Sequence, residues 1–182
     1  MNTPTRRFVA ISLVTLAACA TPQAFADPAA SPAQEDPGAR TAAFVGTWEG
    51  PATGVIDGKT MQPHLTMQCA RAGASPAVFC SAKFTGVKDF DLEEHELFAY
   101  DRASDTFHVF TANNFGEAYD HAATWSDPRA VTFVYATTRK GRAFREEYRY
   151  EWTSPTELRV SGTDTLDGQV TAQATGTLRK TS

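Results

Sequence analysis

The chain has 182 residues, of which 21% are charged and 42% hydrophobic, and its formal net charge at pH 7 is -4. A mildly acidic chain without a cluster of basic residues is unsuited to nucleic acid, so we expect no nucleic-acid partner. Once an N-terminal region outside the fold is removed, about 140 residues remain, which suits one domain with a sizeable core.

The first residues are typical of an export signal. Arg6 and Arg7 form a short basic segment, and the apolar core that follows, Phe8 to Leu16, is too short to span a bilayer. Ala24-Phe25-Ala26 is a small-x-small site, so residues 1–26 are one candidate for a cleaved signal peptide. This pattern predicts an exported, periplasmic protein.

A second cleavage site competes with the first. Leu16-Ala17-Ala18-Cys19 resembles a bacterial lipobox, in which residues 1–18 are removed and Cys19 is lipidated. The protein would then be a membrane-anchored lipoprotein, with Cys19 as its one expected link to a membrane. The sequence leaves both possibilities open.

Residues 27–42 are rich in alanine, proline and acidic residues and contain no aromatic side chain. Such a segment buries too little surface to order itself, so we predict a flexible leader before a domain that spans residues 43–182. Cys69 and Cys80 remain as an even pair once Cys19 is assigned to the signal. In an exported protein this pair predicts a disulfide that joins two neighbouring strands.

From residue 44 onward, alternation of apolar and polar residues dominates, and helical periodicity never lasts beyond two turns. Short connections such as Lys140-Gly141 and Asp167-Gly168 carry turn chemistry. The predicted strands are 46–56, 60–70, 77–86, 93–101, 106–113, 117–126, 130–138, 142–153, 156–163 and 168–179. Short connections imply antiparallel neighbours in chain order, and closure would remove exposed sheet edges. We therefore predict an all-β fold: a single up-and-down antiparallel β-barrel of about 8–10 strands.

The segment from Arg142 to Trp152 shows the alternation most clearly. Its charged residues of alternating sign form one face, which is typical of a solvent-exposed surface, so the other face should point inward. The last strand should turn small side chains inward and leave space in the barrel. The residues expected to line a ligand site are His121, Trp125, Tyr135, Glu146, Tyr148 and Tyr150.

Phe44-Val45-Gly46-Thr47-Trp48 resembles the opening of fatty-acid-binding proteins and the Gly-x-Trp motif of lipocalins. The fuller pattern is similar to an uncharacterised bacterial family of lipocalin-like (calycin-type) proteins, a domain of unknown function. It comprises Gly46-Thr47-Trp48-Glu49-Gly50, Phe98-Ala99-Tyr100-Asp101 and Gly176-Thr177-Leu178-Arg179-Lys180. The resemblance implies that Trp48 closes one end of the barrel and that Arg179 packs over its ring, a cation–π contact.

Two related barrel types fit less well. Fatty-acid-binding proteins have a helical lid after the first strand and a paired-arginine site for the carboxylate, and neither has a match in this chain. Nitrobindin-like haem barrels carry a late proximal histidine, whereas the last histidine here is His121. We therefore expect no cofactor.

The acidic run from Asp89 to Glu96 could attract a cation, but it lacks the glycine and the ligand spacing of a calcium loop. We interpret it as a solvated loop that leads into a strand, and we expect no metal site. Catalytic motifs are also missing, so an enzyme is the less favoured interpretation.

Three functions stay open on this basis. The favoured one is a barrel that binds or carries a small hydrophobic molecule or lipid in the cell envelope. The first alternative is an enzyme acting on a small metabolite through Glu146 and His121. The second is a non-catalytic structural or interaction module with a filled barrel. The oligomeric state is not predicted.

Overall fold

The computed structural model describes residues 37–56 and 58–182. The described residues form one short helix, α1 (Pro37–Ala42), followed by strands only. The strands are β1 (Gly46–Ile56), β2 (Lys59–Met61), β3 (His64–Arg71), β4 (Val78–Val87), β5 (Phe90–Asp101), β6 (Thr106–Asn113), β7 (Ala118–Asp127), β8 (Ala130–Arg139), β9 (Arg142–Ser154), β10 (Glu157–Leu166) and β11 (Gln169–Lys180). No helix in this part of the chain has the length and apolarity that crossing a membrane would require.

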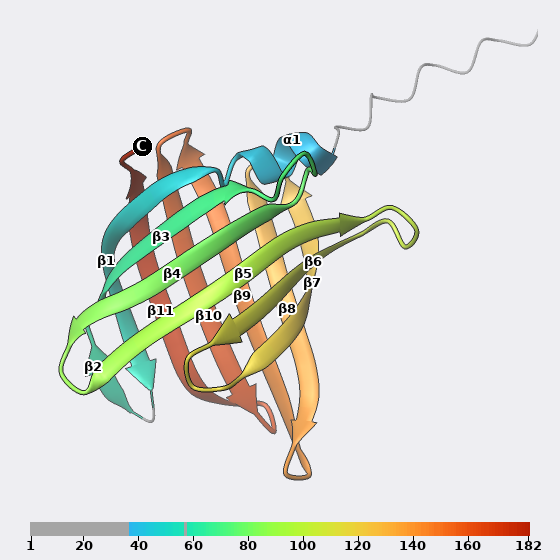
Figure 1. Ribbon diagram of the computed structural model, residues 1–182. Helices are drawn as coiled ribbons and strands as arrows, with labels where there is room; N and C mark the ends of the chain where they lie inside the picture. The colour runs from blue at the N-terminus through green and yellow to red at the C-terminus, as the bar shows by residue number, and fades with distance from the viewer. Residues whose placement is uncertain (1–36, 57) are drawn as a thin grey trace, which may run out of the picture. The chain divides into compact units, whose positions relative to one another are not determined.

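The strands form a closed antiparallel barrel (Figure 1). Neighbours pair in chain order from β3 to β11, and β11 then pairs with β1, for example Thr175 with Thr53. The predicted all-β, up-and-down barrel is confirmed. The hairpin loops at Lys140-Gly141 and Asp167-Gly168 place both residues at positive φ, as a tight two-residue turn between twisted strands requires.

One predicted strand is divided. The sequence pattern favours a continuous strand over 60–70, but the structure breaks it between Met61 and His64. Pro63 in this break has no N–H for a ladder hydrogen bond, and its carbonyl accepts a bond from the Ala52 amide. The short β2 therefore pairs only with the end of β1.

Buried side chains fill the end of the barrel beside α1, the helix labelled in Figure 1. Trp48 is completely buried there, and its indole Nε1 donates a hydrogen bond of 2.7 Å to the Phe44 carbonyl. The Phe44 ring packs against Phe98 and Trp152, with centroids 4.2 and 4.7 Å apart. Trp48 thus closes this end, as the Gly-x-Trp resemblance implies.

Helix α1 occupies the last part of the segment predicted to be a flexible leader. The Thr41 hydroxyl donates to the Pro76 carbonyl at 2.6 Å, which ties the helix to the connection between β3 and β4. A helix of only 6 residues is too short to show apolar periodicity, so sequence patterning missed it. The predicted signal region, Cys19 and residues 27–36 lie outside the described residues.

The cation–π contact on Trp48 is made by a different residue from the one expected. Lys180 Nζ lies 5.5 Å from the Trp48 ring centroid, whereas the Arg179 side chain is 79% exposed and pairs with Glu157. The prediction for Arg179 is therefore wrong. The reason is strand register: Lys180 lies opposite Trp48, and its neighbour Arg179 consequently points outward.

The predicted disulfide is present. Cys69 on β3 lies directly opposite Cys80 on β4, and their sulfur atoms are bonded. Both cysteines are buried and belong to the same core cluster as Trp48 and Met67. The bond therefore links two adjacent strands from inside the barrel.

Replacing both cysteines tests this linkage. The Cys69→Ala/Cys80→Ala double variant should lower the free energy of unfolding by about 2–3 kcal/mol, because the unfolded chain regains loop entropy. Chemical denaturation followed by tryptophan fluorescence measures the change. Equal stability of the double variant and the oxidised wild type would show that the bond does not stabilise the barrel.

Candidate ligand-binding cavity

The other end of the barrel is hollow. A cavity of about 340 Å³ lies inside the strands and is lined by residues of β2, β10 and β11, among others. Figure 1 shows β2 and the β10–β11 hairpin at the end of the barrel away from α1. Ile56 and Phe115 line it and are 39% and 58% exposed, so the cavity reaches the surface there. This volume is within the range of small-molecule sites.

One wall of the cavity is apolar. It is built by β1, β2, β3, β4 and β11, which contribute Ala52, Met61, Leu65, Phe84, Ala172 and Ala174 among others. The small side chains of β1 and β11 leave the volume that larger residues would fill. Alternation in the last strand thus predicts the hollow correctly.

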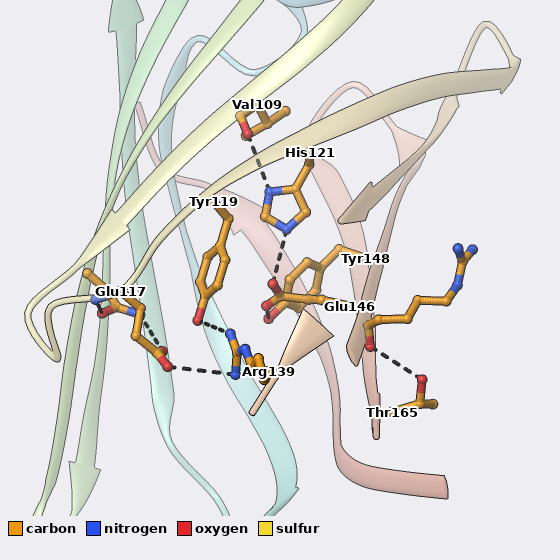
Figure 2. Close-up of polar contacts among 10 residues, drawn as sticks. Val109, Glu117, Tyr119, His121, Arg139, Glu146, Tyr148 and Thr165 are labelled. Carbon is orange, nitrogen blue, oxygen red and sulfur yellow. Dashed lines mark hydrogen bonds and ion pairs between the residues drawn. The ribbon is translucent and has the colours of Figure 1, made fainter. Parts of the chain in front are cut away.

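The opposite wall is polar and centres on His121, Glu146 and Tyr148 (Figure 2). His121 Nδ1 lies 3.3 Å from the Val109 carbonyl, which can only accept, so this nitrogen carries a hydrogen. His121 Nε2 lies 3.2 Å from one Glu146 oxygen, and the Tyr148 hydroxyl donates to the other oxygen at 2.7 Å. One hydrogen between His121 Nε2 and the nearer Glu146 oxygen is enough for a hydrogen bond between them, whether the nitrogen or the oxygen carries it.

Tyr148 depends on a glycine in the next strand. Gly162 on β10 lies opposite Tyr148, and a Cβ atom at position 162 would collide with the Tyr148 ring. The missing side chain therefore lets the ring lie against the β10 backbone and aim its hydroxyl at Glu146. Burial raises the pKa of Tyr148 well above its usual value, so the hydroxyl remains a hydrogen-bond donor.

Glu117, Tyr119 and Arg139 form a second polar cluster beside the first (Figure 2). Arg139 on β8 donates to the Tyr119 hydroxyl at 2.7 Å and lies 3.8 Å from a Glu117 carboxylate oxygen. Its guanidinium also lies 3.5 Å from the centroid of the Phe144 ring. The positive charge of Arg139 is therefore already matched within the wall.

Three further carboxyl groups line the cavity without a basic partner among the described residues: Glu94 and Glu96 on β5, and Asp164 on β10. Burial, with the nearby Glu146 charge, raises the pKa of Glu94 from 4.5 to about 7. Burial and the Glu94 charge raise the pKa of Glu96 to about 8. Burial and Glu146 likewise raise the pKa of Asp164 from 3.8 to about 6.

The structure brings together four of the six residues expected in the site: His121, Glu146, Tyr148 and Tyr150 all line the cavity. Tyr135 does not line the cavity and packs against the rings of Tyr119 and His121, with centroids 5.0 and 5.8 Å away. Trp125 lies four residues along β7 from His121, about 13 Å away. It stacks on Trp152 at the α1 end and does not line the cavity.

The prediction of a solvated loop over the acidic run is wrong. Strand β5 already begins at Phe90, and Glu94 and Glu96 share the inward face of Phe98. Counting back in steps of two from Phe98 would have found both acids. The described residues contain no group of three or more histidine, cysteine or acidic side chains that could hold a metal ion.

No protein-family model matches the chain, and no curated protein matches it. Among solved structures, it is similar to Rv2717c from M. tuberculosis, with 14% identity and a TM-score of 0.57 over 81% of this chain and 99% of that one. It is also similar to the S-type phycobiliprotein lyase CPES from Guillardia theta. That match has 12% identity and a TM-score of 0.54 over 78% of this chain and 90% of the other.

At such low identity these likenesses concern the fold alone. Together with the closed sheet, they identify the fold as a lipocalin-like β-barrel. Membership of the uncharacterised bacterial family, and the significance of the Gly46-Thr47-Trp48-Glu49-Gly50 motif, remain predictions.

The raised carboxyl pKa values predict that the protein becomes less stable to unfolding as the pH rises. The folded protein binds more protons at Glu94 and Glu96 than the unfolded chain does, so the free energy of unfolding should decrease between about pH 5 and pH 8. Glu96→Gln should weaken this decrease and stabilise the protein by about 1–3 kcal/mol at pH 8. Thermal unfolding across this pH range measures both effects.

Glu93→Gln is the matched control, because Glu93 lies on the same strand and pairs with Lys83 at the exterior. An exposed ion pair contributes little to stability, so this variant should keep the wild-type pH dependence. If Glu96→Gln had the same pH dependence as the wild type, Glu96 would not be the buried acid described above.

Proposed function

We propose that this protein binds or carries a small, largely apolar molecule in the hollow end of its barrel. The observation that supports this most directly is the cavity of about 340 Å³, with one apolar wall and one polar wall. Small-molecule sites have this character: apolar surface supplies affinity, and a few convergent polar groups orient the ligand. Two solved structures of other proteins have a similar fold, and this likeness concerns the barrel and not its ligand.

The two alternative functions receive less support. A filled structural barrel does not fit a cavity of this size. An enzyme acting through His121 and Glu146 would need one of these groups to exchange a proton with a substrate. Both imidazole nitrogens and both carboxylate oxygens already have hydrogen-bond partners in Val109, Tyr148 and each other, which argues against such an exchange.

Filling the cavity tests the proposal. Ala174→Phe should occupy part of the hollow and lower the affinity for the neutral dye N-phenylnaphthylamine by about tenfold or more, while the barrel stays folded. Ala136→Phe is the control, because Ala136 lies on the exposed face of β8. Dye fluorescence and native mass spectrometry of protein purified from its source measure occupancy.

Two results would contradict a binding function: absence of any co-purifying molecule together with no dye binding, or equal dye binding by Ala174→Phe and the wild type. Equal loss of binding in the Ala136→Phe control would indicate a general effect on folding rather than on the cavity.

We also propose that the protein acts in the cell envelope. Support comes from the export-like N-terminal sequence and from the Cys69–Cys80 disulfide, since such bonds persist mainly outside the cytoplasm. The intact mass of protein from its source should correspond to a chain that starts at Asp27, or to one that starts at a lipidated Cys19. A mass that retains residues 1–18 would contradict export by either route.

A further inference from the structure

The charges that line the cavity are unbalanced. Five carboxyl groups face it, from Glu94, Glu96, Glu117, Glu146 and Asp164. Two basic side chains line it as well, and each already has an acidic partner: Arg139 lies 3.8 Å from Glu117, and His121 lies 3.2 Å from Glu146. Glu94, Glu96 and Asp164 therefore have no ion pair of their own among the described residues, because His121 and Arg139, the positive groups that act on Glu94 and Asp164, are already paired with other acids.

Glu96 gives an independent indication of a missing partner. The residue is only 8% exposed, and the Tyr150 hydroxyl bonds to its carboxyl group, but its Oε2 atom has no hydrogen-bond partner within the described part of the chain. A buried acceptor without a donor is costly, and the cost is greater when the group is charged. Since Glu96 lines the cavity, a ligand in the cavity could supply the missing donor.

We propose, on the basis of the binding function above, that the ligand is a cationic amphiphile. Its apolar body lies along the wall of β1, β3 and β11, and its protonated nitrogen faces the carboxyl groups of Glu94, Glu96 and Asp164. An organic ammonium group fits better than a metal ion, because the described residues bring no three metal-ligating groups close enough to hold one. An anionic ligand, such as a fatty acid, would place a further negative charge beside these carboxyl groups and would oppose their ionisation, so it should bind less well.

This arrangement couples ligand binding to proton release. Burial and the Glu146 charge raise the pKa of Glu94 to about 7, and burial and the Glu94 charge raise that of Glu96 to about 8, so both are partly protonated near neutral pH. An ammonium group beside them favours the ionised forms and lowers both pKa values. The other ionisable groups that face them are Asp164, the His121–Glu146 pair and the Arg139–Glu117 pair. The hydroxyls of Tyr119, Tyr148 and Tyr150 face them as well. The three hydroxyls stay protonated because burial raises each pKa above the usual value.

The test compares three ligands of equal chain length, decylamine, decanol and decanoate, by isothermal titration calorimetry of the wild-type protein near pH 7. Decylamine should bind at least about tenfold more tightly than decanol, and decanoate should not bind measurably. Repeating the decylamine titration in buffers of different ionisation enthalpy should reveal protons released on binding.

Variants assign the effect to particular residues. Glu94→Gln and Glu96→Gln should each reduce the affinity for decylamine by about tenfold, while the affinity for decanol should stay the same. Glu93→Gln, which removes an exterior carboxylate from the same strand, should change neither affinity. Because decanol binding reports on an intact cavity, a loss specific to decylamine cannot arise from misfolding.

The outcomes separate this inference from the function on which it rests. If decanol or decanoate binds as tightly as decylamine, the cavity binds ligands but does not select a cation, and the inference is overturned. If none of the three ligands binds and the neutral dye also fails to bind, the binding function fails and the inference falls with it.

Discussion

Closure of the sheet between β1 and β11 is the constraint on which the rest of this structure depends. The two strands pair over most of their length, and their backbones approach closely beside Gly50, where a Cβ atom would collide with the Thr177 carbonyl. A sheet closed in this way has no long exposed edge, and it creates an interior that must be filled or left hollow. Other small residues of the same two strands, including Ala52, Gly54, Ala172 and Ala174, line the part that stays hollow.

The interior is consequently divided into two halves with different roles. Near α1, the large side chains of Phe44, Trp48, Phe98 and Trp152 fill the barrel and form its most buried core. Toward the opposite end, glycine and alanine on β1 and β11 face the acids of β5, and no side chain is large enough to cross the space. One half therefore stabilises the fold, and the other can hold a ligand at the cost of carboxyl groups that line the cavity without a basic partner among the described residues.

Much of this could be predicted from sequence, because a strand with one face inward repeats every two residues. Alternation and turn residues predicted the strands. The inward face of β9 predicted that Glu146 and Tyr148 point into the barrel. Partners across the barrel were harder to predict, since they depend on register between strands. Lys180 rather than Arg179 lies over Trp48 for this reason. The acids of β5 were missed because a dense acidic run is usually solvated, and only closure of the sheet buries them.

Amide hydrogen exchange across the seam between β1 and β11 tests the central claim most directly. In a closed barrel, the amides of residues 52–56 and 172–176 that pair across the seam should exchange as slowly as those of the β8–β9 ladder. If these amides exchanged at the rate of an unpaired edge strand, the sheet would be open, and the hollow interior that supports every functional proposal here would not exist.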